Sequence, residues 1–216
     1  GPMTATALAE AVLALATRLT LSPGKRYEAT VSVASRLLTV LGAEGHLVRG
    51  RPRGSWTGTQ HHWATPQDWL GERIPPPMDP ERARIELARA WLARFGPATV
   101  ADLAWWTKWP LRVTRTTLAQ IDTEEVDLDG EVGLVLAGDV EPTPEPEPWV
   151  AFLPSLDPTI MGWKQRDWYL GPHGPALFDT VGNGGPTIWV DGRAVGAWGQ
   201  RKDGEIEVEV LEDVGR

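Results

Sequence analysis

Apolar residues recur at helical spacing in the first part of the chain. They predict one helix over residues 4–17, whose start either Thr4 or Thr6 could cap, and a second helix over residues 27–41. A turn at residues 22–25 separates the two helices. The apolar face of the second helix is formed by Val31, Ala34, Leu37, Leu38 and Leu41. Its more exposed positions are Thr30, Ser32, Arg36 and Thr39.

A short hairpin is predicted after the second helix, which ends at Gly45. Residues 51–56 form its tight tip, residues 60–63 form its returning strand, and it closes near Thr65. The tip is basic, and its cations are Arg49, Arg51 and Arg53.

A proline-rich connector at residues 73–80 interrupts the pattern, because no helix can cross it. Three helices are predicted after it, over residues 81–95, over residues 100–106, and from Leu111 or Val113 to Ile121. Asp79 or Pro80 starts the first of them, and Thr99 caps the second. Strands over residues 125–128 and 132–137 then form a hairpin, which turns at Asp129 and Gly130.

The period changes to that of β-strands after an extended linker at residues 141–148. The predicted strands cover residues 149–153, 168–170, 187–190, 194–200 and 205–211. Asp191 with Gly192, and Asp203 with Gly204, are predicted two-residue turns, so the last three strands form a meander.

A helix followed by a two-stranded basic hairpin is typical of a winged helix, which places a helix in a DNA groove and cations on the phosphates. We therefore predict an α+β fold of tandem winged-helix units followed by a small all-β C-terminal domain. The predicted domains are residues 1–72, 73–140 and 141–216. Only two helices precede the first hairpin, so the first helix of that unit is missing or the domain is trimmed.

The charge of the chain is unevenly distributed around a net value of −8. Residues 24–66 hold six Lys and Arg against two Glu, a local net charge of +4. Residues 116–163 hold eleven Asp and Glu and no Lys or Arg. This asymmetry indicates one basic footprint with acidic flanks; the alternative is a chance asymmetry over a solvated surface. The hairpin at residues 125–137 is acidic, so we expect it to point away from DNA and to serve as a scaffold.

Other features bound the class of protein. The chain has no cysteine, which fits a cytoplasmic protein, and no apolar run approaches the length of a membrane span. Its twelve tryptophans are typical of bacterial proteins. His46, His61 and His62 do not predict a metal site, because adjacent histidines on a strand point to opposite faces. A contact in a DNA groove or a half-buried ring is the better interpretation, and we expect no cofactor.

Four segments resemble the C-terminal part of the winged-helix DNA glycosylases, the AlkZ/YcaQ-like superfamily. They are residues 49–56, 94–107, 153–168 and 182–193, and the resemblance extends in matching order over nearly the whole chain. It implies three tandem winged helices and a β-domain that cradle DNA, in enzymes that excise alkylated bases and can unhook interstrand crosslinks. Because members are longer, we expect this chain to be a fragment without the first winged helix and with a truncated β-domain.

The catalytic motif of that superfamily is Gln-x-Gln or Gln-x-Asp near the N-terminus. Gln120, Ile121 and Asp122 have this spelling but lie where a helix joins a strand of the acidic hairpin. We therefore expect that they are not catalytic, that the catalytic segment lies outside this chain, and that the fragment alone is inactive.

The candidate DNA-binding residues are Lys25, Arg26, Arg36, Arg49, Arg51, Arg53, Gln60, His61, His62, Lys164 and Arg166. Lys164 and Arg166 have two interpretations, an ion-paired turn with Asp157 and Asp167 or a phosphate site. We expect Lys164 and Arg51 to face a common concave surface. The expected partner is double-stranded DNA, damaged or alkylated, bound by a monomer. Two alternatives stay open: a non-catalytic winged-helix DNA-binding protein such as a transcription regulator, and a protein-interaction scaffold.

Overall fold

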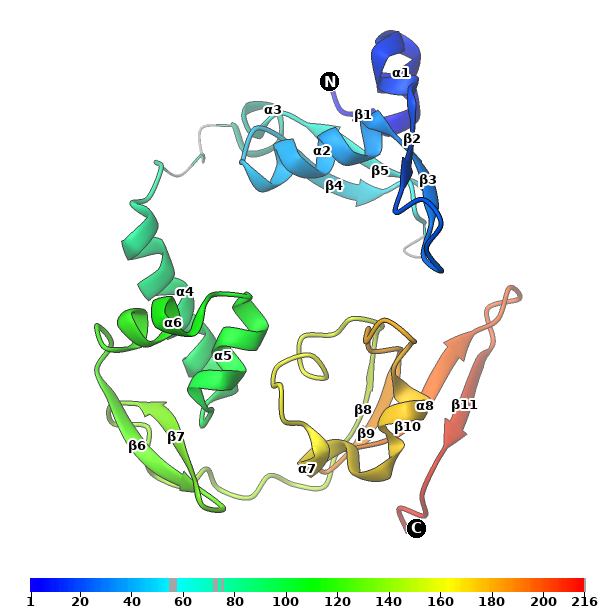
Figure 1. Ribbon diagram of the computed structural model, residues 1–216. Coiled ribbons are helices and arrows are strands. Elements are labelled where there is room, and N and C mark those ends of the chain that lie inside the picture. The colour runs from blue at the N-terminus through cyan, green and yellow to red at the C-terminus, as the bar shows by residue number, and fades with distance from the viewer. Residues whose placement is uncertain (55–57, 72–73, 75, 216) are drawn as a thin grey trace. The chain divides into compact units, whose positions relative to one another are not determined.

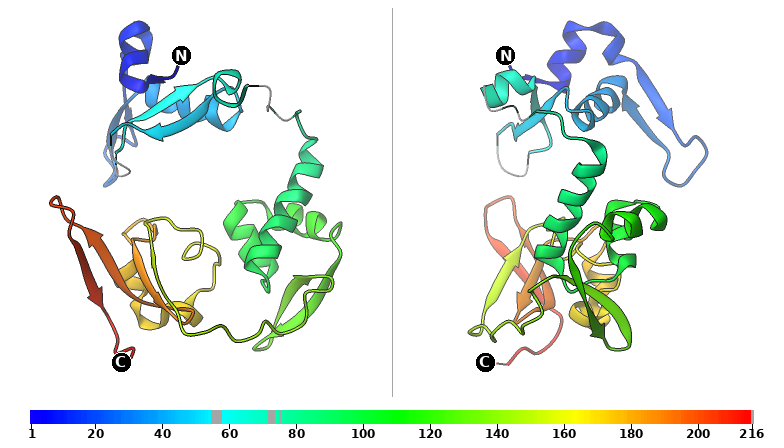
Figure 2. Two further views of the ribbon diagram at one scale, coloured as in Figure 1. Left: turned by 180° about the vertical axis from the view of Figure 1, so that it is seen from behind. Right: turned by 90° about the vertical axis from the view of Figure 1, so that its left-hand side faces the viewer.

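The computed structural model describes residues 1–54, 58–71, 74 and 76–215. The chain has two compact units, Gly1–Pro77 (unit 1) and Met78–Arg216 (unit 2), and each is described by itself (Figures 1 and 2). Both combine helices with antiparallel strands, in agreement with the predicted α+β class. No helix among the described residues is long and apolar enough to cross a membrane.

Unit 1 is built on a three-stranded antiparallel sheet of order β1-β5-β4. Its elements are β1 (Met3–Thr4), α1 (Ala5–Ala11), the 3-10 helix η1 (Leu13–Ala16), β2 (Arg18–Leu21), β3 (Ala29–Ser32), α2 (Val33–Ala43), β4 (Val48–Pro52), β5 (His61–Ala64) and α3 (Pro66–Leu70). Helix α2 packs closely on this sheet, because a Cβ on Gly42 would lie 3.2 Å from the indole of Trp63. Ala34 and Leu38 of α2 are buried, as is Ala64 of β5.

The first predicted helix is shorter than expected. The Thr4 hydroxyl caps it by accepting from the Ala7 N–H, as predicted, but α1 ends at Ala11 and a 3-10 turn follows. Apolar spacing continues beyond this point in the sequence, yet the residues of α1 and η1 are at most half-buried. Periodicity alone therefore overestimated the length of the helix.

The prediction of a helix over residues 27–41 is wrong for its first six residues. Residues Ala29–Ser32 form β3, which pairs with β2, and α2 begins only at Val33. Thr30 and Val31 are β-branched and favour a strand, and the Ser32 hydroxyl caps α2 by accepting from the Ser35 N–H. The end of the helix is as predicted, since Gly45 adopts a φ of +79° just beyond it.

The N-terminal part of unit 2 contains three helices and a hairpin, as predicted. They are α4 (Pro80–Phe95), α5 (Val100–Thr107), α6 (Leu111–Leu118), β6 (Thr123–Leu128) and β7 (Glu131–Leu136). The predicted caps are confirmed, because the side chains of Asp79 and Thr99 accept from the first N–H groups of α4 and α5. Asp129 and Gly130 both have a positive φ, as the turn between β6 and β7 requires.

The C-terminal part of unit 2 is a four-stranded antiparallel sheet of order β11-β10-β9-β8 with short helices on one face. Its elements are β8 (Val150–Leu153), α7 (Asp167–Leu170), the 3-10 helix η3 (Gly171–His173), α8 (Gly174–Leu177), β9 (Thr187–Val190), β10 (Arg193–Gln200) and β11 (Ile206–Val210). The meander is confirmed. The turn with Asp203 and Gly204 is longer than two residues, since residues 201–205 connect β10 to β11.

The predicted strand at residues 168–170 is wrong, and this part of the chain is therefore not all-β. These residues belong to helix α7, whose Tyr169 and Leu170 pack under Trp189 of the sheet. Three apolar residues in a row carry no period that separates a strand from a buried helix. Tyr169 is fully buried and its hydroxyl donates to the Ile160 carbonyl oxygen, and burial raises the pKa of its phenol.

A buried carboxylate connects the two parts of unit 2. Asp102 is 3% exposed, and its Oδ2 accepts from both the N–H and the hydroxyl of Thr99. Its Oδ1 accepts from the backbone N–H groups of Lys164 (2.8 Å) and Gln165 (3.2 Å). Beside it, Trp163 Nε1 donates to the Phe95 carbonyl oxygen at 2.9 Å. One side chain therefore both caps α5 and fixes the segment that leads into α7.

We expect Asp102→Ala to destabilise unit 2 by about 3 kcal/mol, because it removes the cap and leaves two backbone N–H groups without their acceptor. Urea unfolding followed by tryptophan fluorescence measures this, since nine of the twelve tryptophans lie in unit 2. Asp139→Ala, at an exposed position, is the control and should change the free energy by less than about 0.5 kcal/mol. Equal effects of the two substitutions would show that the carboxylate does not hold the two parts together.

Candidate nucleic-acid interface

Strand β4 presents a row of exposed arginines. Arg49 and Arg51 are exposed and alternate with the half-buried Val48, Gly50 and Pro52, as the two-residue period of a strand dictates. Arg53 continues this alternation just beyond the strand, where its N–H donates to the Gln60 carbonyl oxygen. These three exposed guanidinium groups on one hairpin supply charged donors of the kind that bind phosphates.

The pairing of β4 with β5 is irregular in the segment that contains Arg49 and Arg51. Arg49 is opposite Trp63 and Pro52 is opposite His61, so the register shifts between them. Such a bulge twists the strand and changes the direction of its side chains. Of the predicted tip at residues 51–56, the structure describes residues 51–54, and Ser55 and Trp56 lie outside the described residues.

A hydrogen bond from its imidazole ring fixes the orientation of the His61 side chain in this hairpin. Its Nδ1 lies 3.1 Å from the Gly50 carbonyl oxygen and donates to it. The neighbouring His62 is half-buried and lies opposite Thr4 of β1. The two histidines therefore have different surroundings, as alternation along a strand requires.

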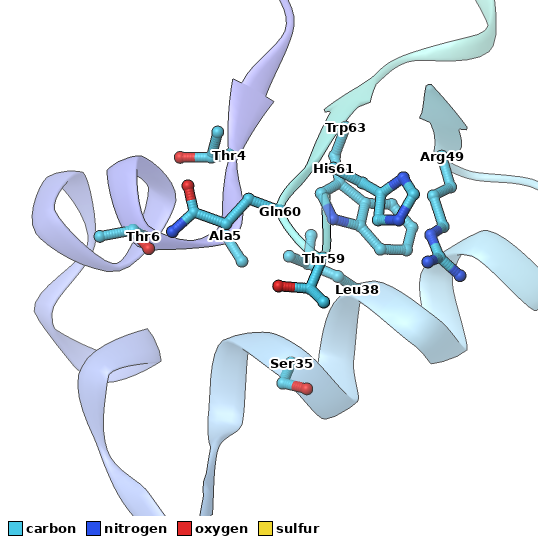
Figure 3. Close-up of a pocket in the computed structure, with 10 residues that line it drawn as sticks. All are labelled: Thr4, Ala5, Thr6, Ser35, Leu38, Arg49, Thr59, Gln60, His61 and Trp63. Carbon is cyan, nitrogen blue, oxygen red and sulfur yellow. The ribbon is translucent and has the colours of Figure 1, made fainter. Parts of the chain in front are cut away.

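A cavity of about 300 Å³ adjoins this hairpin (Figure 3). Arg49, Gln60 and His61, all predicted DNA-binding residues, line it together with residues of β1, α1 and α2. The Gln60 amide points toward the hydroxyls of Thr4 and Thr6, whereas Arg49 and His61 lie on the other side. The remaining lining residues are Ala5, Ser35, Leu38, Thr59 and Trp63.

This lining offers hydrogen-bond donors and acceptors around a small apolar floor. Amide and hydroxyl groups can bond either base edges or phosphate oxygens, and Arg49 supplies one positive charge. Thr4, Thr6, Ser35, Thr59 and Trp63 were not among the predicted site residues. Pairing of β1 with β5 brings Thr4 beside this hairpin, and no local pattern in the sequence encodes that pairing.

The other predicted cations of unit 1 lie on two further elements. Arg36 is exposed in the first turn of α2, next to Ser35 at the cavity. Lys25 and Arg26 are exposed in the tip that joins β2 to β3. The sequence had predicted that they precede a helix, but they lie at the tip of the ribbon formed by β2 and β3.

Arg166 in unit 2 is held between aromatic rings. Its guanidinium carbon lies 4.4 Å from the centre of the Phe178 ring and 5.0 Å from that of Trp105. Lys164 is exposed, and the Asp157 carboxylate accepts from the Thr159 N–H. Among the described residues, no ion pair forms within the set Asp157, Lys164, Arg166 and Asp167, so the interpretation as an ion-paired turn is wrong. A phosphate site at Lys164 and Arg166 stays a prediction.

Carboxylates lie close to Lys164 and Arg166 in a cavity of unit 2. Lys164 and Arg166 line a cavity of about 970 Å³ in unit 2. Its carboxylates come mainly from the β6–β7 hairpin and are Asp102, Asp127, Asp129, Glu131 and Asp167. Glu131 also accepts from the Gln165 side chain, which connects the hairpin to the segment before α7. This cavity would repel a phosphate more strongly than the β4 surface does.

Gln120 lies at the end of α6 and its amide is already occupied. Its Nε2 donates to Glu81 Oε1 at 3.0 Å and to the Thr116 carbonyl oxygen at 3.2 Å. Ile121 between the two polar residues is buried in the helical core, and the Asp122 carbonyl oxygen accepts from the Ala137 N–H. These contacts are those of a helix-to-strand connection.

The division of charge follows the division of the fold. Unit 1 holds eight Lys and Arg against five Asp and Glu, a net charge of +3, and unit 2 holds 13 against 24, a net charge of −11. A polyanion is therefore attracted to unit 1 and repelled by unit 2.

The comparisons with known proteins extend over the whole chain. A family model described as "DNA glycosylase AlkZ-like" matches residues 1–215. Among solved structures, the chain is similar to the Streptomyces sahachiroi DNA glycosylase AlkZ, with a TM-score of 0.64 and 21% sequence identity. The match covers 98% of this chain and 62% of that one, so the chain spans less than two thirds of that protein. At this identity the likeness shows the fold. No curated protein matches the chain.

We expect Arg166→Ala to lower the stability of unit 2 by about 1–2 kcal/mol, because it removes a guanidinium that lies against two rings. Lys164→Ala is the matched control, since it also removes one positive charge but has an exposed side chain. It should change the free energy of unfolding by less than about 0.5 kcal/mol. Chemical denaturation of both variants measures the difference, and equal stabilities would argue against a structural role for Arg166.

Proposed function

The chain belongs to the AlkZ-like DNA glycosylase family, and we propose that it is the duplex-binding part of a DNA repair enzyme that excises alkylated bases. The observation that carries this proposal is the exposed arginine row of β4 beside a polar cavity, in the one unit with a positive net charge. Phosphate contacts of this kind position a protein on DNA, and neighbouring amide and hydroxyl groups can then contact the bases.

We assign unit 1 as a winged helix. The order β1, α1, α2, β4, β5 and the sheet order β1-β5-β4 support this assignment, in which α2 enters a groove and β4 with β5 forms the wing. The β2–β3 ribbon is an insertion between its two helices. Helices α4 to α6 with the β6–β7 hairpin form the second winged helix, and the sheet β8 to β11 forms the C-terminal domain.

Most DNA-contacting residues of this proposal come from three elements of unit 1, and Lys164 and Arg166 of unit 2 are further candidates for a phosphate contact. Arg49, Arg51, Arg53, Gln60, His61 and His62 belong to the wing, Arg36 belongs to α2, and Lys25 and Arg26 belong to the ribbon. The acidic hairpin β6–β7 is a scaffold that points away from the phosphates, because its five carboxylates between Glu124 and Glu131 would be repelled.

Base excision needs a nucleotide turned out of the stack and an activated water that attacks the sugar. Gln120 does not fit this role, because its amide is bonded to Glu81 and to the backbone of its own helix. The proposal therefore assigns the water-activating residues to a segment outside residues 1–216. Unhooking of interstrand crosslinks would need the same segment.

Our first functional prediction concerns duplex affinity. Arg51→Ala combined with Arg53→Ala should weaken binding equally for all sequences, because phosphate contacts carry no sequence information. The slope of log K against log salt should become smaller in magnitude by about 1.8, for two lost phosphate contacts. Fluorescence anisotropy with short duplexes at several salt concentrations measures both quantities.

The control for this variant removes two charges from unit 2. Arg82 and Arg89 are exposed on α4, and replacing both with Ala gives the same change of net charge. The control should keep the wild-type slope. A wild-type slope in the Arg51/Arg53 variant as well would remove the wing from the footprint.

Our second functional prediction is that residues 1–216 alone do not release an alkylated base from duplex DNA. A gel assay of abasic-site formation on DNA that contains 7-methylguanine measures this, with a known glycosylase as the positive control. Release by the wild-type chain that is lost in Gln120→Ala would show that Gln120 is catalytic.

A further inference from the structure

Within unit 1, the β2–β3 ribbon projects beyond the sheet and helices of that unit (Figures 1 and 2). Leu19 pairs with Val31 and Thr20 with Thr30, so one face of the ribbon is apolar and the other is polar. All residues from 22 to 30 are exposed. A two-stranded hairpin buries little on its own and is marginally stable in water. The ribbon therefore contributes little to the packing of unit 1, and a role in binding would explain why it projects.

The tip of this ribbon is nevertheless held in a defined conformation. Ser22 and Gly24 have φ values of +51° and +74°, and the Gly24 N–H donates to the Glu28 carboxylate at 2.6 Å. The Lys25 N–H donates to the Ser22 carbonyl oxygen at 3.0 Å. The residues presented by this tip are Lys25, Arg26 and Tyr27, and Tyr27 is 70% exposed.

A single exposed aromatic residue needs no special explanation. Tyr27 differs from such a residue in two respects: two cations directly precede it, and it lies at the end of a ribbon that projects beyond the sheet and helices of unit 1. An aromatic ring next to positive charge is the combination that proteins use to stack on nucleobases while neutralising phosphates.

The base of the ribbon is joined directly to α2. Ser32 is both the last residue of β3 and the N-cap of α2, so no loop separates strand from helix. The Val33 N–H donates to the Thr17 carbonyl oxygen at 2.8 Å, which closes the base of the ribbon. Strand β3 covers the four residues Ala29–Ser32, which span about 10 Å at a strand's rise of about 3.3 Å per residue, and Tyr27 lies in the turn beyond them.

We propose that Tyr27 stacks on a base of the duplex, with Lys25 and Arg26 on the flanking phosphates, at a separate place from the contact of α2. A DNA groove admits a two-stranded ribbon, and side chains that enter between base steps are a known means of gripping a duplex. This inference rests on the proposed duplex binding and adds a base contact to it.

The experiment measures duplex affinity of the full 216-residue chain by fluorescence anisotropy, over a series of salt concentrations. Tyr27→Ala should raise Kd about tenfold, because stacking of one base is lost. It should leave the salt slope unchanged, since no charge is removed. Tyr27→Phe keeps the ring and should bind like the wild-type chain.

Two controls separate stacking from other effects. Lys25→Ala combined with Arg26→Ala should reduce the magnitude of the salt slope by about 1.8, for two phosphates. Leu13→Ala removes an apolar side chain of unit 1 that is 82% exposed and lies outside the ribbon, and it should bind normally. Circular dichroism of each variant verifies that the fold is intact.

The outcomes distinguish this inference from the function on which it rests. A wild-type chain that does not bind duplex DNA at low salt would overturn the proposed function itself. Binding by Tyr27→Ala that equals the wild-type affinity would overturn only the stacking contact. Equal losses in Tyr27→Phe and Tyr27→Ala would also overturn it, because they would assign the effect to the hydroxyl group.

Discussion

The burial of one carboxylate controls the architecture of unit 2. Asp102 starts α5 through its bonds to Thr99 and holds the backbone of Lys164 and Gln165 with its second oxygen. A buried charge is tolerated only when hydrogen bonds satisfy it, so the two segments must meet at this point for either to be stable. The position of Trp163 against Phe95 and the position of Arg166 between two rings both depend on this junction.

The separation of charge between the two units gives the protein an electrostatic polarity. A net charge of +3 in unit 1 attracts a polyanion, while a net charge of −11 in unit 2 repels one. At about 0.1 M salt such fields act over roughly 10 Å, so the repulsion limits where a duplex can dock more than how tightly the arginines hold it. If a duplex binds as we propose, the repulsion by unit 2 adds to the attraction by the arginines of β4 in directing it to unit 1.

Local signals in the sequence predicted much of the fold, and non-local pairing explains most of the rest. Thr99 was identified as a cap, and Thr4 and Asp79 were each one of two candidates, because capping depends on one side chain and the next turn of backbone. Residues 29–32 were misassigned because their pairing with β2 competes with an apolar spacing that also fits a helix. At the candidate site the cations could be predicted from charge alone. Thr4 and Ser35 could not, since the cavity arises only when β1 pairs with β5 and α2 packs beside them.

The direct passage from β3 into α2 has a consequence for the thermodynamics of binding. Because Ser32 both ends β3 and caps α2, no loop separates the ribbon from the helix. Hydrogen bonds within the tip and the pairing of β2 with β3 define the conformation of the ribbon, so a ligand that contacts both elements spends less free energy on ordering it. Once such a ligand touches α2, the tip of the ribbon is held near it at a high effective concentration. The second contact, whether of α2 or of the ribbon tip, then lowers the dissociation rate of the ligand more than it raises the association rate.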